Sequence, residues 1–461
     1  MANKIDNKEQ IKKIGKHIAV RRMMKGMTQQ DLAEKIGTSK SNISRMESGN
    51  QNLSLDTLMR VAYAFQDELS MELREPSEIV YDAENTDYVL KLYDEVLVGF
   101  KMTRELGLST IATEITYIND KKKHLLPIDL ELTNEGVINW LKNRSVPSNR
   151  QFANEFLMAV GLNSKDTKGI IDLCKGLSLN DSYWVVPKSF TGKFDEYNLY
   201  DNRFDEVIGI MAYTGNYYGG VEFRTSPEFT TNGMLRKAWR YKNNNEIWLY
   251  KGGTEGFANT GNEPFCEFYA CQVAEKMGLN AVHYELENWK GILASICKLF
   301  TDKDTSYIPI GRIVKTGGID ACAEYIKNIS DEAYQDFCSM LAFDAVVFNE
   351  DRHFGNFGVL RDNKSGKLKG LAPIFDNGIS LFCYAMKDDF DNLAKYASER
   401  TNPYRVDYID VCKKYLGSKQ KSQLRKLIGF KFERSDLMNL PEWRLKKIEK
   451  MIQKRVAELL D

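Results

Sequence analysis

The sequence lacks the features that mark metal-binding and disulfide-rich proteins. Its eight cysteines contain no C-x-x-C pair and form no cluster with the four histidines at metal-ligand spacing. Zinc sites and disulfide frameworks are normally recognised by such spacings. We therefore expect reduced structural thiols, with neither a zinc site nor disulfide bonds.

Membrane spans and a strong charge bias are absent as well. No apolar run approaches the roughly 20 residues that cross a bilayer, and the start, MANKIDNKEQ, is polar. Lys plus Arg equals Asp plus Glu at 64 each, which excludes a uniformly basic nucleic-acid-binding surface. Residues 1–70 nevertheless carry twelve basic residues against eight acidic ones. A cytoplasmic protein with no membrane partner and a modest basic bias at one end is predicted.

The chain is long enough for several domains. Its 461 residues exceed the roughly 250–300 at which one hydrophobic core usually stops growing, and 43% of them are hydrophobic. Periodicity and composition predict the α+β class, with an all-α domain ahead of an α+β region whose C-terminal part is helical. The expected segments are an all-α domain at 1–70, a linker at 71–85, a small α+β subdomain at 86–225, a strand and helix core at 226–300 and a helical lobe at 301–461.

Residues 8–66 show four helical patterns separated by short polar breaks. In the second pattern, TQQDLAEKIG, Thr28 and Asp31 have the spacing of a capping box ahead of an apolar stripe. The third pattern, TSKSNISRMESGN, begins with Ser39 as a predicted N-cap. We therefore predict four short helices, two of them joined by a very short turn.

The order T-Q-x-x-L-A-x-x-x-G-x-S-x-x-x-I-S-x-x-E-x-G in this segment resembles the helix-turn-helix module of phage-repressor and Xre-type regulators. The resemblance implies that residues 28–49 bind operator DNA, with the third helix in the major groove and the protein acting as a homodimer on two half-sites. A plain helical bundle with solvated polar residues is the alternative. The DNA-binding residues that the resemblance implies are Gln29 at a phosphate, Lys40, Ser41 and Arg45 at base edges, and Ser39 beside them.

The stretch FNEDRHFGNFGVL, residues 348–360, is polar and lies between apolar runs. Phosphoryl transfer needs a carboxylate that accepts the proton of the attacking hydroxyl, and oxygen ligands for Mg²⁺. Protein kinases supply both in the pattern H-R-D-x-x-x-x-N. Asp351 and Asn356 have the spacing of that Asp and Asn, although here Arg352 and His353 follow the Asp instead of preceding it.

A second metal ligand is expected across a hairpin. The segments FGVLRD and KLKGLAPIF read as two strands joined by the turn sequence NKSG. In an antiparallel pair the start of the first strand lies opposite the end of the second. Asn356 and Asp376 are therefore predicted to lie side by side and to share a Mg²⁺ ion.

A kinase also needs a lysine on a strand that binds the nucleotide phosphates, and a glutamate on a helix that positions this lysine. The run EIWLYKGG predicts a strand that carries Lys251, and Glu267 follows sixteen residues later on a helical pattern. Glu263 is a weaker candidate because it precedes Pro264 and is expected to lie before the helix. Upstream, SPEFTTNGMLRKAW suits a phosphate-covering loop, with Gly233 and Lys237 as its nucleotide-binding residues. Each piece alone has an ordinary structural explanation, but the ordered set favours a kinase.

The motifs NEDRHFGNFGVL, GLAPIFDNG and EFYACQVAEKMGL resemble those of the HipA-like serine/threonine kinases, toxins of bacterial toxin-antitoxin pairs, over residues 226–400. The resemblance implies ATP and Mg²⁺ as cofactors, Asp351 as catalytic base, Lys251 and Glu267 as its ATP-site partners, and Asn356 and Asp376 as metal ligands. Arg352 and His353 are expected to brace the loop. Autophosphorylation of the loop before the lysine strand is implied as well, with Ser226, Thr230 and Thr231 as candidates.

These inferences combine into a protein Ser/Thr kinase fused to its own antitoxin-like, autoregulatory DNA-binding domain. A translation factor such as an aminoacyl-tRNA synthetase is the substrate class that the resemblance implies. Two alternatives stay open: a regulator whose silent kinase fold senses a nucleotide, and a small-molecule phosphotransferase. The last helical pattern, PEWRLKKIEKMIQKRVAELLD, is expected either to close the C-terminal lobe or to form a dimer seam.

Overall fold

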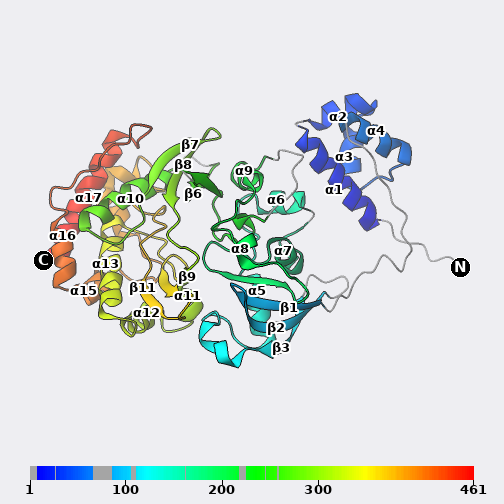
Figure 1. The fold of residues 1–461 in the computed structure, drawn as a ribbon. Coiled ribbons are helices and arrows are strands. Elements are labelled where there is room, and N and C mark those ends of the chain that lie inside the picture. Colours follow the sequence, from blue (N-terminus) through cyan, green and yellow to red (C-terminus); the bar gives the residue numbers. More distant parts are fainter. Residues whose placement is uncertain are drawn as a thin grey trace.

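A computed structural model gives the fold (Figure 1). It describes residues 8–25, 27–65, 86–104, 111–160, 162–216, 225–243, 245–256 and 259–461. The linker expected at 71–85 lies outside the described residues. Within these ranges, no helix combines the length and apolarity that a bilayer crossing requires.

Four short helices form the N-terminal bundle, as the sequence predicts. Thr28 and Asp31 make a capping box at the start of the second helix, and Ser39 accepts a hydrogen bond from the Asn42 N–H at the start of the third. Leu32, Ile43 and other apolar residues fill the bundle's core. The four helices are α1 (Lys8–Met24), α2 (Gln29–Ile36), α3 (Lys40–Glu47) and α4 (Leu55–Phe65).

The next subdomain is built on a four-stranded antiparallel sheet in the order β3-β2-β1-β4. The strands are β1 (Thr86–Leu92), β2 (Glu95–Arg104), β3 (Ile111–Ile118) and β4 (Tyr183–Pro187). The helices are η1 (Asp120–Leu125), α5 (Asn134–Lys142), α6 (Ala153–Ala159), α7 (Thr167–Cys174), α8 (Phe194–Tyr197) and α9 (Glu206–Thr214).

A second antiparallel sheet, in the order β5-β6-β8-β7, carries one wall of the site. Helix α10 (Glu263–Met277) packs against it. The expectation that Glu263 precedes this helix is wrong: Glu263 is its first residue, because a proline in the first turn costs no hydrogen bond. The other elements are η2 (Pro227–Thr230), β5 (Lys237–Lys242), β6 (Glu246–Gly252), β7 (Glu285–Trp289) and β8 (Ile292–Lys298).

The predicted hairpin is present in a third sheet of order β11-β10-β9. Strands β10 (Gly358–Asp362) and β11 (Leu368–Leu371) are antiparallel, with Val359 opposite Leu371, and β9 (Thr305–Pro309) pairs with the other edge of β10. This register places the residue before β10 near the segment after β11. The hairpin therefore brings the two halves of the predicted metal site to one end of the sheet.

Helices fill the C-terminal lobe around one large apolar core. The last helix, α17 (Glu442–Leu460), buries Leu445, Ile448 and Ile452 in that core, so its apolar face closes the lobe (Figure 1). The other helices are α11 (Ile310–Ile313), α12 (Gly318–Lys327), α13 (Asp331–Val347), η3 (Asp389–Asn392), α14 (Leu393–Ser398), α15 (Tyr408–Tyr415) and α16 (Ser418–Arg425).

Candidate active site

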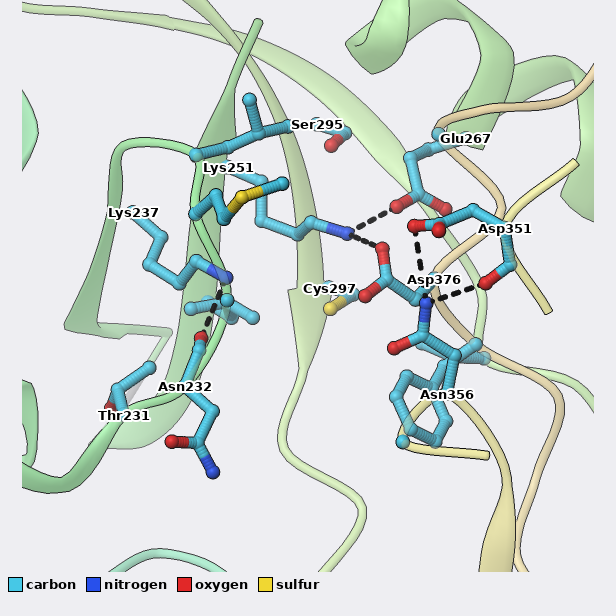
Figure 2. A pocket seen from close by; sticks show the side chains of 18 of the residues that line it. Thr231, Asn232, Lys237, Lys251, Glu267, Ser295, Cys297, Asp351, Asn356 and Asp376 are labelled. Carbon is cyan, nitrogen blue, oxygen red and sulfur yellow. Dashed lines mark hydrogen bonds and ion pairs between the residues drawn. The ribbon is translucent and has the colours of Figure 1, made fainter. Parts of the chain in front are cut away.

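A cleft of about 1000 Å³ lies between the second sheet and the helical lobe. Both sides contribute charged side chains, and Figure 2 shows them converging from strands, a helix and two loops. Ser226 is buried and does not line the cleft. The sequence-predicted residues that line it are Thr230, Thr231, Gly233, Lys237, Lys251, Glu267, Asp351, Asn356 and Asp376.

Lys251 is the centre of the charged cluster. It extends from β6 and forms ion pairs with Glu267 of α10 and with Asp376, which comes after β11. Burial favours the neutral amine, but the two carboxylates outweigh it and raise the pKa of Lys251 well above its usual value. The lysine is therefore a fixed positive charge at the floor of the cleft (Figure 2).

Asp376 and Glu267 are held in complementary ways. Burial opposes ionisation of Asp376, yet the positive charges of Lys251 and Lys237 outweigh it and hold the pKa of Asp376 well below its usual range. The second carboxylate oxygen of Glu267 accepts a hydrogen bond of 2.7 Å from the Asn377 N–H. Glu267 thus fixes both the lysine and the segment that carries the aspartate.

The loop after α13 presents Asp351 and Asn356 to the cleft. The amide nitrogen of Asn356 donates to the backbone oxygen of Asp351 at 2.8 Å and to its carboxylate at 3.4 Å. Its amide oxygen points the other way, into the cleft (Figure 2). Burial raises the pKa of Asp351. The side chain of Asp351 keeps 40% exposure, so an entering hydroxyl group can reach its carboxylate.

Arg352 braces this loop from behind. Its guanidinium is 1% exposed and pairs with the Asp344 carboxylate of α13 at 3.0 Å. It also donates to the backbone oxygens of Asn356 and Phe375 and to the amide oxygen of Asn377. One buried side chain therefore ties α13 to both segments that carry the predicted metal ligands.

His353 lies at the mouth of the cleft and has a smaller role. Its Nδ1 accepts a hydrogen bond of 3.0 Å from the Gly355 N–H, and its Nε2 lies 3.9 Å from the Asp351 carboxylate. A Cβ on Gly355 would lie 2.9 Å from Nδ1, which explains the glycine. The imidazole holds the turn of the loop beside Asp351.

The segment before β5 is pinned by residues that the sequence did not single out. Arg150, which lies before α6, forms a fully buried ion pair with Glu228 and donates to the backbone oxygens of Glu228 and Lys237. The other carboxylate oxygen of Glu228 accepts from the Trp239 N–H at 2.7 Å. The Arg150–Glu228 pair joins positions 78 residues apart, so the local sequence carried no signal for it.

Lys237 closes the same segment over the cleft. Its ammonium donates to the Asn232 backbone oxygen at 2.8 Å, directly under Gly233. Gly233 has φ +95°, and a Cβ there would lie 2.2 Å from the lysine nitrogen. Burial and the nearby charge of Lys251 lower the pKa of Lys237 to about 7. Because a Cβ at position 233 would overlap the ammonium group, a side chain there would displace Lys237.

The three hydroxyl candidates for phosphorylation differ in their surroundings. Ser226 accepts from the Glu228 N–H and is buried. Thr230, also buried, donates to the Leu177 backbone oxygen at 2.8 Å. Thr231 is half-buried, donates to the Pro227 backbone oxygen and accepts from the Trp239 indole N–H at 2.9 Å.

The donor set suits a nucleotide with Mg²⁺. Magnesium prefers carboxylate and amide oxygens and keeps several water ligands, and Asp376 and Asn356 supply one oxygen group of each kind at one side of the cleft. Lys251 and Lys237 offer two cationic groups for phosphate oxygens. The residues present therefore fit the cofactors that the sequence suggested.

The surface of the N-terminal bundle bears the other predicted residues. Ser39, Lys40, Ser41 and Arg45 are exposed on or beside α3. Gln29 instead turns inward, because its amide donates to the Glu47 carboxylate at 2.8 Å. Glu47 also pairs with Arg22 of α1, so Gln29 helps to fix α2 against α3.

The described chain consists of a four-helix N-terminal bundle followed by an α+β region that holds the charged cleft. A helix-turn-helix family model matches residues 18–66, so the N-terminal domain is of that type. The serine/threonine-protein kinase CtkA of Helicobacter pylori is 27% identical over 164 residues, which cover 32% of this chain. The chain spans about half (50%) of the length of this curated relative.

Solved structures of two proteins align with the chain as well. The H. pylori proinflammatory kinase CtkA aligns with a TM-score of 0.37 and 20% identity, over 49% of this chain and 91% of its own. The Shewanella oneidensis toxin-antitoxin complex of HipA, HipB and operator DNA contributes a chain with a TM-score of 0.46 and 12% identity. That alignment covers 81% of this chain and 99% of the other.

Proposed function

We propose that the protein is an ATP- and Mg²⁺-dependent protein Ser/Thr kinase of the HipA-like toxin type, restrained by its own DNA-binding domain. The observation that carries the proposal is the Lys251 ion pair with Glu267 and Asp376, in one cleft with Asp351 and Asn356. If Lys251 were an ordinary solvated lysine and Glu267 an exposed helical glutamate, the two side chains would not be buried together. Removing charges from water costs free energy, so a buried charged cluster of this kind indicates a structural or functional role.

Each residue has a chemical task in the transfer. Lys251 binds phosphate oxygens, and Glu267 keeps it in place. Mg²⁺, when bound, neutralises the charge that develops on the phosphates, and Asn356 and Asp376 would hold it. Asp351 orients the attacking hydroxyl and accepts its proton, for which its raised pKa suits it better than an ordinary surface aspartate.

Autophosphorylation of the loop before β5 would regulate the enzyme. The hydroxyls of Thr230 and Thr231 donate to backbone oxygens and so hold the loop in place. A phosphate group cannot donate these bonds and brings about two negative charges. Phosphorylation of either residue would therefore expel the loop from the cleft. Thr231 is the more accessible of the two.

Incubation of the purified full chain with ATP and Mg²⁺, followed by mass spectrometry, tests this proposal. We expect phosphate on residues 226–231, and none in Asp351→Asn or Asp376→Asn. Asp436→Asn, an exposed carboxylate change in the C-terminal lobe, is the matched control and should leave labelling unchanged. Valine at 230 or 231 and alanine at 226 identify the acceptor.

The alternatives give different results in the same assay. A nucleotide-sensing regulator would bind ATP with Mg²⁺ and shift its DNA affinity without labelling any protein. A small-molecule phosphotransferase would label an added metabolite but not itself. The absence of phosphate on any residue or added substrate would contradict the enzyme proposal.

The DNA-binding half of the proposal rests on the helix-turn-helix match and the exposed face of α3. We expect a homodimer that binds operator DNA through residues 28–49 and represses its own expression. A translation factor, such as an aminoacyl-tRNA synthetase, is the proposed protein substrate. The fusion would keep toxin and restraint at a fixed ratio of one to one.

A further inference from the structure

Three residues with metal-binding side chains meet outside the cleft. Cys271 and Glu275 lie one turn apart on α10, and His283 lies in the segment between α10 and β7. Their ligand atoms all lie within 4.8 Å of one another. None of the three lines the cleft described above.

The contacts within this cluster arrange a buried sulfur beneath an open face. The Cys271 thiol is buried and faces the backbone oxygens of Phe268 at 3.2 Å and Tyr284 at 3.7 Å. His283 Nδ1 and Glu275 Oε1 lie 2.5 Å apart, with side chains that are 62% and 48% exposed. Because both side chains are exposed, a cation from solvent can displace the proton that the imidazole and the carboxylate share and can bind these two groups together with the nearby sulfur.

The geometry points to a binding site for one Zn²⁺ ion, ligated by the Cys271 sulfur, a Glu275 carboxylate oxygen and a His283 ring nitrogen. These are three of the ligand types that zinc uses, and three protein ligands leave a fourth tetrahedral position for water. A thiolate also selects zinc over harder cations such as Mg²⁺ and Ca²⁺. The three ligands lie outside the cleft, and the existence of the site does not depend on the proposed phosphoryl transfer.

The spacing of the cysteines and histidines predicts no zinc site, because the sequence has no C-x-x-C pair and no Cys/His cluster. This site has one cysteine, and its glutamate and histidine follow at intervals of four and eight residues. Gly278 ends α10 in the left-handed conformation, with φ +75°. The chain turns there and brings His283 back against the helix. Only the tertiary fold brings the three groups together.

Binding would couple the ion to the helix that carries Glu267. Glu267, Cys271 and Glu275 are spaced four residues apart, so they share one face of α10. A Zn²⁺ ion would link Cys271 and Glu275 of this face to His283, in the segment before β7. We therefore expect bound metal to raise the thermal unfolding temperature, since a ligand that binds only the folded state stabilises it.

Cobalt titration of the chelator-treated full chain tests the site directly. Co²⁺ replaces Zn²⁺ in such sites and gives a thiolate-to-cobalt charge-transfer absorption. We expect saturation at one Co²⁺ per chain, displacement by Zn²⁺, and loss of the charge-transfer band in both Cys271→Ser and His283→Gln. Cys322→Ser, which removes a buried thiol of α12, is the control that should keep the band.

His283→Gln guards against misfolding as an explanation, because the side chain is exposed and its loss should leave the fold intact. Its unfolding temperature without metal should equal that of the wild type, and added Zn²⁺ should raise only the wild-type value. The inference is wrong if the wild type shows no charge-transfer band. It is equally wrong if the band survives in both Cys271→Ser and His283→Gln.

Discussion

Lys251 and Asp376 form an ion pair of 2.5 Å although 125 residues separate them in the chain. Strand β6 supplies the lysine, and the segment after the β10–β11 hairpin supplies the aspartate. The same lysine contacts Glu267, whose other oxygen accepts from the Asn377 N–H. Strand β6, helix α10 and the segment after β11 thus share one hydrogen-bonded network, so a substitution in any one of them should alter the contacts of the other two.

Lys237 should make stability depend on pH. Its pKa is about 7 in the fold against 10.5 for the free side chain, because burial and Lys251 disfavour its charge. Between these values the unfolded chain binds more protons, so stability rises with pH, by at most about 1.4 kcal/mol for each pH unit. Below pH 7 the folded protein carries the full cost of the buried charge.

Lys237→Met removes this charge, and unfolding temperatures between pH 6 and 10 measure the effect. We expect the variant to gain stability relative to the wild type at low pH, with the advantage shrinking as pH rises. Lys242→Met, an exchange on the same strand at a half-buried site, is the control. A difference between wild type and Lys237→Met that does not change with pH would contradict the assignment.

Arg352→Met should destabilise the protein strongly. The substitution leaves the Asp344 carboxylate buried without its ion-pair partner, which typically costs about 3–5 kcal/mol. Urea unfolding midpoints measure the loss. Lys454→Met removes a largely exposed pair with Glu458 on α17 and should cost no more than about 1 kcal/mol.

The double variant Arg352→Met with Asp344→Asn should recover part of the lost stability, since no charge then stays buried alone. Equal unfolding midpoints for Arg352→Met and Lys454→Met would mean that the contacts of Arg352 contribute little to the stability of the fold.

Arg45→Ala should weaken binding to DNA from the region upstream of the coding sequence. A base-contacting arginine contributes roughly 1–3 kcal/mol of sequence discrimination, and Arg45 is exposed on α3. Fluorescence anisotropy at fixed salt measures the affinity for this DNA and for a scrambled duplex. Arg60→Ala removes the same charge from α4, where it pairs with Asp56, and should have little effect. Equal losses in the two variants would argue against base contact by Arg45.

Local patterns predicted local structure well. The capping box of α2, the N-cap of α3 and the β10–β11 hairpin follow from residues a few positions apart, and the structure confirms them. Glu263 was predicted outside α10 because the proline beside it was read as a boundary. Proline fits the first helical turn, so the boundary lies one residue earlier.

Contacts between distant segments were beyond the sequence. The Arg150–Glu228 pair that pins the loop joins residues in different subdomains, and neither belongs to a recognisable motif. The sequence indicated that Arg352 braces the loop, but it gave no sign that Arg352 donates to Asn356 and Asn377. The proposed zinc site depends on the chain turn after α10, which brings His283 to Cys271 and Glu275 on the helix.

In the proposed function, Asp351 directs the γ-phosphate of ATP onto protein hydroxyls. The most direct measurement adds purified wild type or Asp351→Asn, with γ-labelled ATP and Mg²⁺, to matched portions of one cell lysate. We expect labelled protein bands that the wild type produces and Asp351→Asn does not, with phosphate on serine or threonine. Identical labelling in the two portions would contradict it.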